Sequence, residues 1–131
     1  MTGETNLDEL IKSLSAVLVE GLYGFATVPS HQARLDIKPR MVFEEAEGTT
    51  YILLKSEAEA HELSFEFPCR MITLNIHSSL EAVGFMARIA TELAKHDMGV
   101  NPVSGFFHDH LFVPDGREND AMNALEAMSK I

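Results

Sequence analysis

Two histidines and a carboxylate stand together in His108-Asp109-His110. On a β-strand, His108 and His110 project from the same face, and with His77 or Asp109 they could hold a metal ion. No second group of ligands with a diagnostic spacing accompanies the triplet, and histidines in strands more often form local hydrogen bonds. The sequence therefore predicts no metal site.

Carboxylates and one thiol are the other groups that could do chemistry. Glu44, Glu45 and Glu47 are close enough for acid–base work, but no nucleophile or histidine is near them in sequence. Cys69 precedes Arg70, but it stands in an apolar stretch that favours a buried thiol over a reactive one. The chain has no phosphate loop, nucleophile elbow, dinucleotide fingerprint or zinc-hydrolase motif. We therefore expect neither enzymatic activity nor a cofactor.

The chain is strongly acidic. Its 131 residues include 20 Asp and Glu against 10 Lys and Arg, which gives a formal net charge of −10. That charge repels phosphate backbones and anionic lipids, so neither nucleic acid nor membrane is an expected partner. The segment MTGETNLDEL lacks the basic and apolar regions of a secretory signal, and no apolar run is long enough to span a bilayer. Together with a single cysteine, these features predict a cytoplasmic protein.

The first half of the chain predicts a mixture of helices and strands. Asn6 and Glu9 form a capping-box-like start, and apolar residues at helical spacing predict a helix over 7–18. There follow a strand over 22–28, a loop over 30–39, a hairpin of strands 41–43 and 50–54, and a short polar helix over 56–62. We expect Gly48 to supply a positive φ in the hairpin turn.

The segment 64–76 is long and extended, but its apolar residues change parity. They stand at odd positions first and at even positions afterwards: Phe65 and Phe67, then Ile72, Leu74 and Ile76. Because alternate residues of a strand face opposite sides, a bulge near Pro68 would account for the change. We expect residues 64–67 to close the N-terminal half and residues 70–76 to open the C-terminal half, without a linker.

The second half predicts the element order β, α, β, β, α. Ser78 and Glu81 form a capping box ahead of an alanine-rich helix that ends before Gly99. Strands over 100–107 and 108–113 and a last helix follow it. This is the ferredoxin-like order without its final strand, so the two halves are expected to complete one another around segment 64–76.

Two runs of the second half resemble the ACT domain: IHSSLEAVGFMARIATELAKHDMGVN and VSGFFHDHLFVP. The similarity is to ACT modules of the aspartokinase type and of the cytosolic arginine sensors. Together with the joining run EFPCRMITL, the whole chain is similar to small bacterial ACT proteins that carry no catalytic domain. The resemblance implies an α+β fold, with an N-terminal ACT-like half over 1–63 and a ferredoxin-like ACT domain over 64–131 that share a long strand.

The resemblance also implies a ligand and a partner copy. ACT modules pair their sheets between modules or subunits and bind a small ligand, usually an amino acid, at the paired interface, so a homodimer or higher homo-oligomer is expected. The family's ligand loop is here 77–84, and its opposite wall is 104–109. The predicted ligand-binding residues are Ser78, Ser79, Leu80, Glu81, Ala82, Val83, Gly84, Ser104, Phe106 and Asp109. Where many members of the family carry an early Asp and Gly in the loop, this chain has Ser78, Ser79 and Leu80.

Elementary physics supports a ligand at this loop independently of the resemblance. The first turn of a helix leaves backbone N–H groups unpaired, and the helix dipole favours an anion such as a carboxylate there. Gly84 would allow a ligand to approach closely, and Asp109 could receive its ammonium group. Each residue also has a structural reading, in which Ser78 caps the helix, Gly84 permits packing and Asp109 shapes the turn.

Two hypotheses of function follow. In the first, the protein is a regulatory sensor that binds a free amino acid and passes the signal to a partner protein. In the second, it is a structural interaction module whose sheet edge pairs with a partner and which has lost ligand binding. The missing Asp and Gly of the loop favour the second hypothesis, and the capped loop with Gly84 and Asp109 favours the first.

Overall fold

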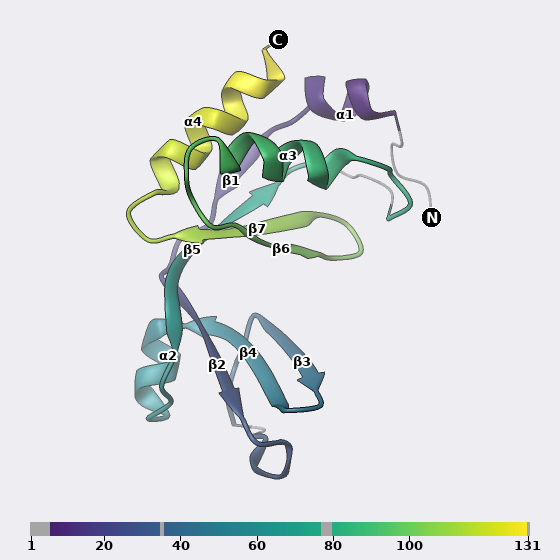
Figure 1. The fold of residues 1–131 in the computed structure, drawn as a ribbon. Helices are drawn as coiled ribbons and strands as arrows, with labels where there is room; N and C mark the ends of the chain where they lie inside the picture. The colour runs from purple at the N-terminus through teal and green to yellow at the C-terminus, as the bar shows by residue number, and fades with distance from the viewer. Residues whose placement is uncertain (1–5, 35, 77–79, 131) are drawn as a thin grey trace. The chain divides into compact units, whose positions relative to one another are not determined.

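The computed structural model describes residues 6–34, 36–76 and 80–130 (Figure 1). By their contacts the residues form two compact units. One is built from two segments, Met1–Glu20 and Arg70–Ile131, and is called the split unit here. The other is Gly21–Cys69, the continuous unit. Among the described residues, no helix is both long enough and apolar enough to cross a bilayer.

The split unit contains a four-stranded ferredoxin-like sheet in the order β1-β5-β7-β6. Its strands are β1 (Ala16–Leu18), β5 (Glu66–Leu74), β6 (Asn101–Ser104) and β7 (Asp109–Pro114). β1 lies antiparallel to β5 and occupies the place of the final strand, which the C-terminal half lacks. The N-terminal segment therefore completes the unit that the C-terminal half begins.

The predicted helix over 7–18 is wrong in its second half. Helix α1 (Leu7–Lys12) begins as expected, because the Asn6 side chain accepts a hydrogen bond from the Glu9 N–H at 3.1 Å. It ends at Ser13, and the chain then enters β1. The spacing of Leu14, Val17 and Leu18 suits a helix, but pairing with β5 decides the conformation. Hydrogen bonds flank the β1 ladder, from Asn75 N–H to Ser15 and from Val19 N–H to Met71, at 2.6 and 2.9 Å.

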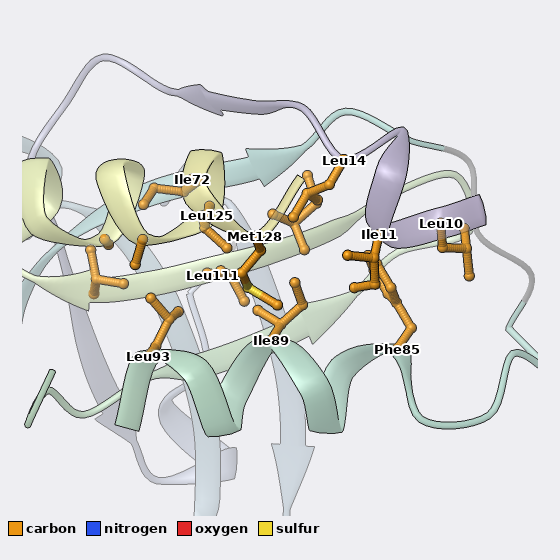
Figure 2. Close-up of a cluster of buried hydrophobic side chains, with 14 of the residues drawn as sticks. Leu10, Ile11, Leu14, Ile72, Phe85, Ile89, Leu93, Leu111, Leu125 and Met128 are labelled. Atoms are coloured by element: carbon orange, nitrogen blue, oxygen red, sulfur yellow. The ribbon is translucent and has the colours of Figure 1, made fainter. Parts of the chain in front are cut away.

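Three helices cover one face of the split unit's sheet: α1, α3 (Phe85–Ala94) and α4 (Glu118–Ser129). Their apolar stripes meet the sheet in one core, drawn in Figure 2. Its fully buried members include Leu10, Ile72, Leu74, Ile89, Leu93, Leu111, Val113 and Ala121. Burial on this scale is the main source of the unit's stability.

Helix α3 starts later than its sequence predicts. Gly84 is its N-cap residue, with φ of 86°, and Phe85 is its first residue. Val83, which fits the helical spacing, lies outside the helix and is 85% exposed. A glycine inside a helix is unfavourable, whereas a left-handed residue at its start suits glycine, so the helix forms after Gly84. Ser78, the predicted cap, lies outside the described residues.

The continuous unit repeats the ferredoxin-like strand order as β3-β4-β2-β5. Its own strands are β2 (Tyr23–Val28), β3 (Met41–Glu45) and β4 (Gly48–Leu54), and its helices are the 3-10 turn η1 (Ser30–Gln32) and α2 (Lys55–Ala60). The strand predicted over 22–28 is β2, and it is the opening strand of this unit. The predicted hairpin is confirmed, and its Gly48 has φ of 156°. A Cβ at Gly48 would lie 2.6 Å from the Val28 carbonyl oxygen, so only glycine fits there.

Strand β5 belongs to both units, and the boundary between them falls between Cys69 and Arg70. The predicted bulge near Pro68 is confirmed. Tyr23 is opposite Cys69 and Phe25 is opposite Glu66, so three residues of β2 (23–25) span the same length as four of β5 (66–69). Phe67, inside this bulge, has φ of 57°. The predicted division between residues 63 and 64 remains a prediction.

Candidate functional site

A small hollow of about 130 Å³ lies in the split unit between the start of α3 and the turn that joins β6 to β7. It is lined by Leu80, Ala82, Phe85, Met86, Ser104, Gly105 and Asp109. Four of the ten predicted ligand residues are among them: Leu80, Ala82, Ser104 and Asp109. The hollow brings the predicted loop and the predicted opposite wall together on one unit.

Asp109 is the charged group of this hollow, and it is only 8% exposed. It opens β7 and stands opposite Ser104, the last residue of β6. The Ser104 hydroxyl donates a hydrogen bond of 2.5 Å to Asp109 Oδ1. The turn between the strands is closed by a hydrogen bond of 2.8 Å from the Gly105 N–H to the His108 carbonyl. Withdrawing a carboxylate from water is unfavourable unless it is hydrogen-bonded, and the Ser104 hydroxyl supplies one such bond to Asp109.

The first turn of α3 provides the opposite charge. Its N-cap is Gly84, which has no side chain that could cap the helix, and the first N–H groups of an α-helix have no partner within the helix. The helix dipole adds to their attraction for an anion. The anion-ready turn therefore lies at Gly84–Met86 rather than after Ser78.

The structure gives a conformational reason for glycine at position 84. Its φ of 86° is left-handed, which suits glycine at the start of a helix. A Cβ there would lie 3.7 Å from Leu7, and close approach of a ligand to Gly84 remains a prediction. Gly84 ends the loop and starts the helix, and it does not lie one turn inside it.

The remaining predicted residues lie apart from the hollow's described lining. Glu81, Val83 and Gly84 belong to the same loop without lining it. Phe106 is 55% exposed and packs edge-to-face on Phe107, with ring centroids 4.9 Å apart. Ser78 and Ser79 lie outside the described residues.

Three lining residues were missing from the predicted set: Phe85, Met86 and Gly105. A helix starting at Ser78 would have carried Phe85 and Met86 well past its first turn. The signal that could have found them is Gly84 itself, since a glycine after exposed Val83 is typical of a chain reversal before a helix.

The other chemically suggestive residues have structural partners. His110 Nδ1 lies 3.0 Å from the Thr73 hydroxyl on β5, and its ring centroid is 6.4 Å from that of His108. Over residues 6–34, 36–76 and 80–130, no three His, Cys, Asp or Glu side chains are placed to hold a metal ion. Cys69 is fully buried, and Glu45 accepts a hydrogen bond of 2.5 Å from Thr50 across the hairpin.

Protein-family models match both halves of the chain. The ACT domain family matches the chain twice, over residues 2–70 and over residues 66–127. The chain belongs to the ACT domain family. The two matches overlap at β5, the strand that both units use. Membership supports a regulatory, ligand-binding role in general, since ACT domains bind amino acids and oligomerise.

Solved structures include similar chains. A Vibrio cholerae protein of unknown function, described as a possible transport protein, is 35% identical, with 94% of this chain and 95% of that chain covered and a TM-score of 0.84. The Agrobacterium tumefaciens protein Atu0741 is 15% identical, with coverage of 88% and 89% and a TM-score of 0.76. The ligand-free regulatory subunit of aspartate kinase from Thermus thermophilus is 9% identical, with coverage of 88% and 99% and a TM-score of 0.62, a likeness of fold. No curated protein matches the chain.

Proposed function

We propose that this ACT protein is a non-catalytic cytoplasmic sensor that binds a free amino acid in the hollow between α3 and the β6–β7 turn. The observation that carries the proposal is that a nearly buried carboxylate, Asp109, and the first residues of α3, Phe85 and Met86, line the same hollow. A free amino acid carries the complementary charges. Its ammonium group would meet Asp109, and its carboxylate would meet the N–H groups at the start of α3.

The size and lining of the hollow favour a small aliphatic side chain. Its volume of about 130 Å³ is well below the ~300 Å³ at which pockets for drug-sized ligands begin. Leu80, Ala82 and Met86 offer apolar contacts, and none of the described lining side chains is cationic. An acidic side chain would therefore lack a partner, and a long or aromatic one would lack space. Pairing of two copies would close the ligand from water and carry the signal to a partner protein.

A second candidate is an interaction module without a ligand. Four large apolar side chains near the hollow are exposed: Leu80 at 61%, Val83 at 85%, Phe106 at 55% and Phe107 at 61%. Such side chains are typical of a surface that another protein covers. In this reading Asp109 holds the β6–β7 turn through Ser104 and has no ligand to bind.

A thermal-shift panel of the twenty amino acids separates the two functions. A ligand at one hundred times its Kd should add about 2.7 kcal/mol of stability. We expect small aliphatic amino acids to raise the melting temperature and lysine, arginine and tryptophan to leave it unchanged. If no amino acid raises it, the interaction module is the better description.

A further inference from the structure

A groove runs along the helical side of the split unit and is separate from the hollow. It consists of two hollows of about 370 and 380 Å³, which share Glu92 and Met128. The first lies between α3 and α4, and the second extends from α3 to α1. Ile11 and Met128 form part of its floor and are 9% and 4% exposed, since both belong to the core of Figure 2. The groove thus has an apolar floor at the edge of the unit's core.

The end of this groove toward α1 is cationic, which is unusual in a chain of net charge −10. Its lining includes three cations, Lys12, Arg88 and Lys95, against two carboxylates, Asp8 and Glu92. Lys95 lies 3.4 Å from Glu92 and neutralises it. Neither Lys12 nor Arg88 forms an ion pair or a side-chain hydrogen bond with any described residue. Two cations therefore stand ready for anionic groups from outside the unit.

The β3–β4 hairpin of the continuous unit has the complementary surface. Phe43 is 63% exposed and Val42 is 51% exposed, although both stand on a strand. Glu44 and Glu47 follow them at the turn, and neither has a side-chain partner within the described part of the chain. β3 is also the outer strand of the continuous unit's sheet. Exposed apolar side chains on an edge strand favour aggregation, and a binding partner that covers them prevents it.

We infer that the groove of one copy receives the β3–β4 hairpin of a second copy. Val42 and Glu44 share one face of β3, so the apolar floor covers Val42, and Lys12 and Arg88 meet Glu44 and Glu47. Such a contact joins two different surfaces, so each copy keeps one free groove and one free hairpin and can bind further copies. This contact differs from the sheet pairing that the ACT family implies, and it does not depend on an amino-acid ligand.

Charge reversal tests this contact in the full chain. One variant carries Lys12→Glu and Arg88→Glu, and the other carries Glu44→Lys and Glu47→Lys. Each alone should weaken association roughly tenfold in sedimentation velocity at low salt, because attraction becomes repulsion. Mixing the two variants should restore it, since each reversed groove then meets a reversed hairpin. Pairing of sheet edges would not respond to mixing in this way.

A charge control and a cross-linking experiment accompany the charge reversal. The variant Lys55→Glu with Lys130→Glu makes the same change in net charge outside the groove and should associate as the wild type does. A photoreactive amino acid in place of Val42 should cross-link to residues that line the groove. Mixing isotope-labelled and unlabelled protein tells whether the cross-link joins two chains. Wild type that stays monomeric, mixed variants that fail to associate, or cross-links within one chain would each overturn the inference.

Discussion

The two units share one strand order but differ in the helices that cover it. In the split unit, the first strand β5 leads to the full helix α3, whose first residues line the hollow. In the continuous unit, the first strand β2 leads to the short turn η1 and then to an irregular segment that reaches β3. One strand order therefore carries different first connections, and only a helix of several turns offers the dipole that favours an anion at its start.

Polar contacts hold the irregular segment of the continuous unit in place of a helix. The Arg34 guanidinium donates two hydrogen bonds to Asp36, at 3.2 and 2.9 Å, and a third to the His61 carbonyl at 3.3 Å. His61 Nε2 lies 3.1 Å from Glu57 Oε1 on α2. The Arg34 N–H also donates to the Tyr51 hydroxyl at 3.0 Å. Where the split unit has the N-terminal turn of α3, the continuous unit joins its charged groups to each other.

Truncation of a core side chain should have the largest effect, and it should lower the free energy of unfolding in both units. Ile89→Ala in the split unit and Leu53→Ala in the continuous unit remove fully buried side chains, so each should lower the free energy of unfolding by about 2–5 kcal/mol. Because β5 belongs to both units, we expect one cooperative transition in urea by circular dichroism for each variant. Two separate transitions in either variant would show that the units unfold independently.

The next largest effect is a loss of stabilisation by amino acids, which we expect from a substitution in the split unit but not from one in the continuous unit. Asp109→Asn should abolish the stabilisation by amino acids, which is about 2.7 kcal/mol at one hundred times Kd, because an amide does not pair with an ammonium group as a carboxylate does. Asp36→Asn is the matched control, since it makes the same change in the continuous unit. Thermal-shift titrations of both variants check this prediction. An equal loss in both would place the ligand elsewhere.

A smaller effect concerns the start of α3. Gly84→Ala forces a side chain into the left-handed region at φ of 86° and should reduce stability by about 1–2 kcal/mol. Gly99→Ala is the control, because a Cβ there meets nothing within 4 Å. It should change stability by less than about 0.5 kcal/mol in the same urea titration. A similar loss at both positions would mean that the turn before α3 is not strained by a side chain.

The smallest effect is a dependence on pH in the continuous unit. The hydrogen bonds from Arg34 lower the pKa of Asp36 below its ordinary value of 3.8 and raise that of Arg34. A carboxyl group with a lowered pKa stabilises the folded state above its ordinary pKa, and this contribution disappears as the pH falls through the folded value. The stability difference between wild type and Asp36→Asn should therefore be present at neutral pH and vanish in acid. A difference that grows in acid would contradict the pairing.

Local signals in the sequence predicted much of the fold. The parity change around Pro68 identified the bulge in β5, and the turn at Gly48 identified the hairpin, because each depends on neighbouring residues only. The segment Ala16–Leu18 could not be assigned in the same way. Its apolar spacing suits a helix, and its strand conformation depends on β5, more than fifty residues further along the chain.

The sequence named the two segments that line the hollow, but it misplaced the start of helix α3. The loop and the wall that line the hollow were expected from the family resemblance, and Asp109 and Ser104 are on it. The start of α3 was misplaced, because Ser78 and Glu81 satisfy the pattern of a capping box as well as a true helix start does. The left-handed φ of Gly84 places the helix start at Phe85 instead of after Ser78, and this backbone angle cannot be read from the sequence.

The strand β5 sets an order of events during protein synthesis. The continuous unit has all its residues once Cys69 has been made, whereas the split unit is complete only after the second half of the chain has been made. The apolar side chains of α1 and β1, made earlier, must wait for Arg70–Leu74 and then for α3, β7 and α4 to cover them. At roughly 5–20 residues per second, this wait lasts several seconds. The segment made first is thus among the last to be buried, and during that interval it is the part of the nascent chain most open to a chaperone or to aggregation.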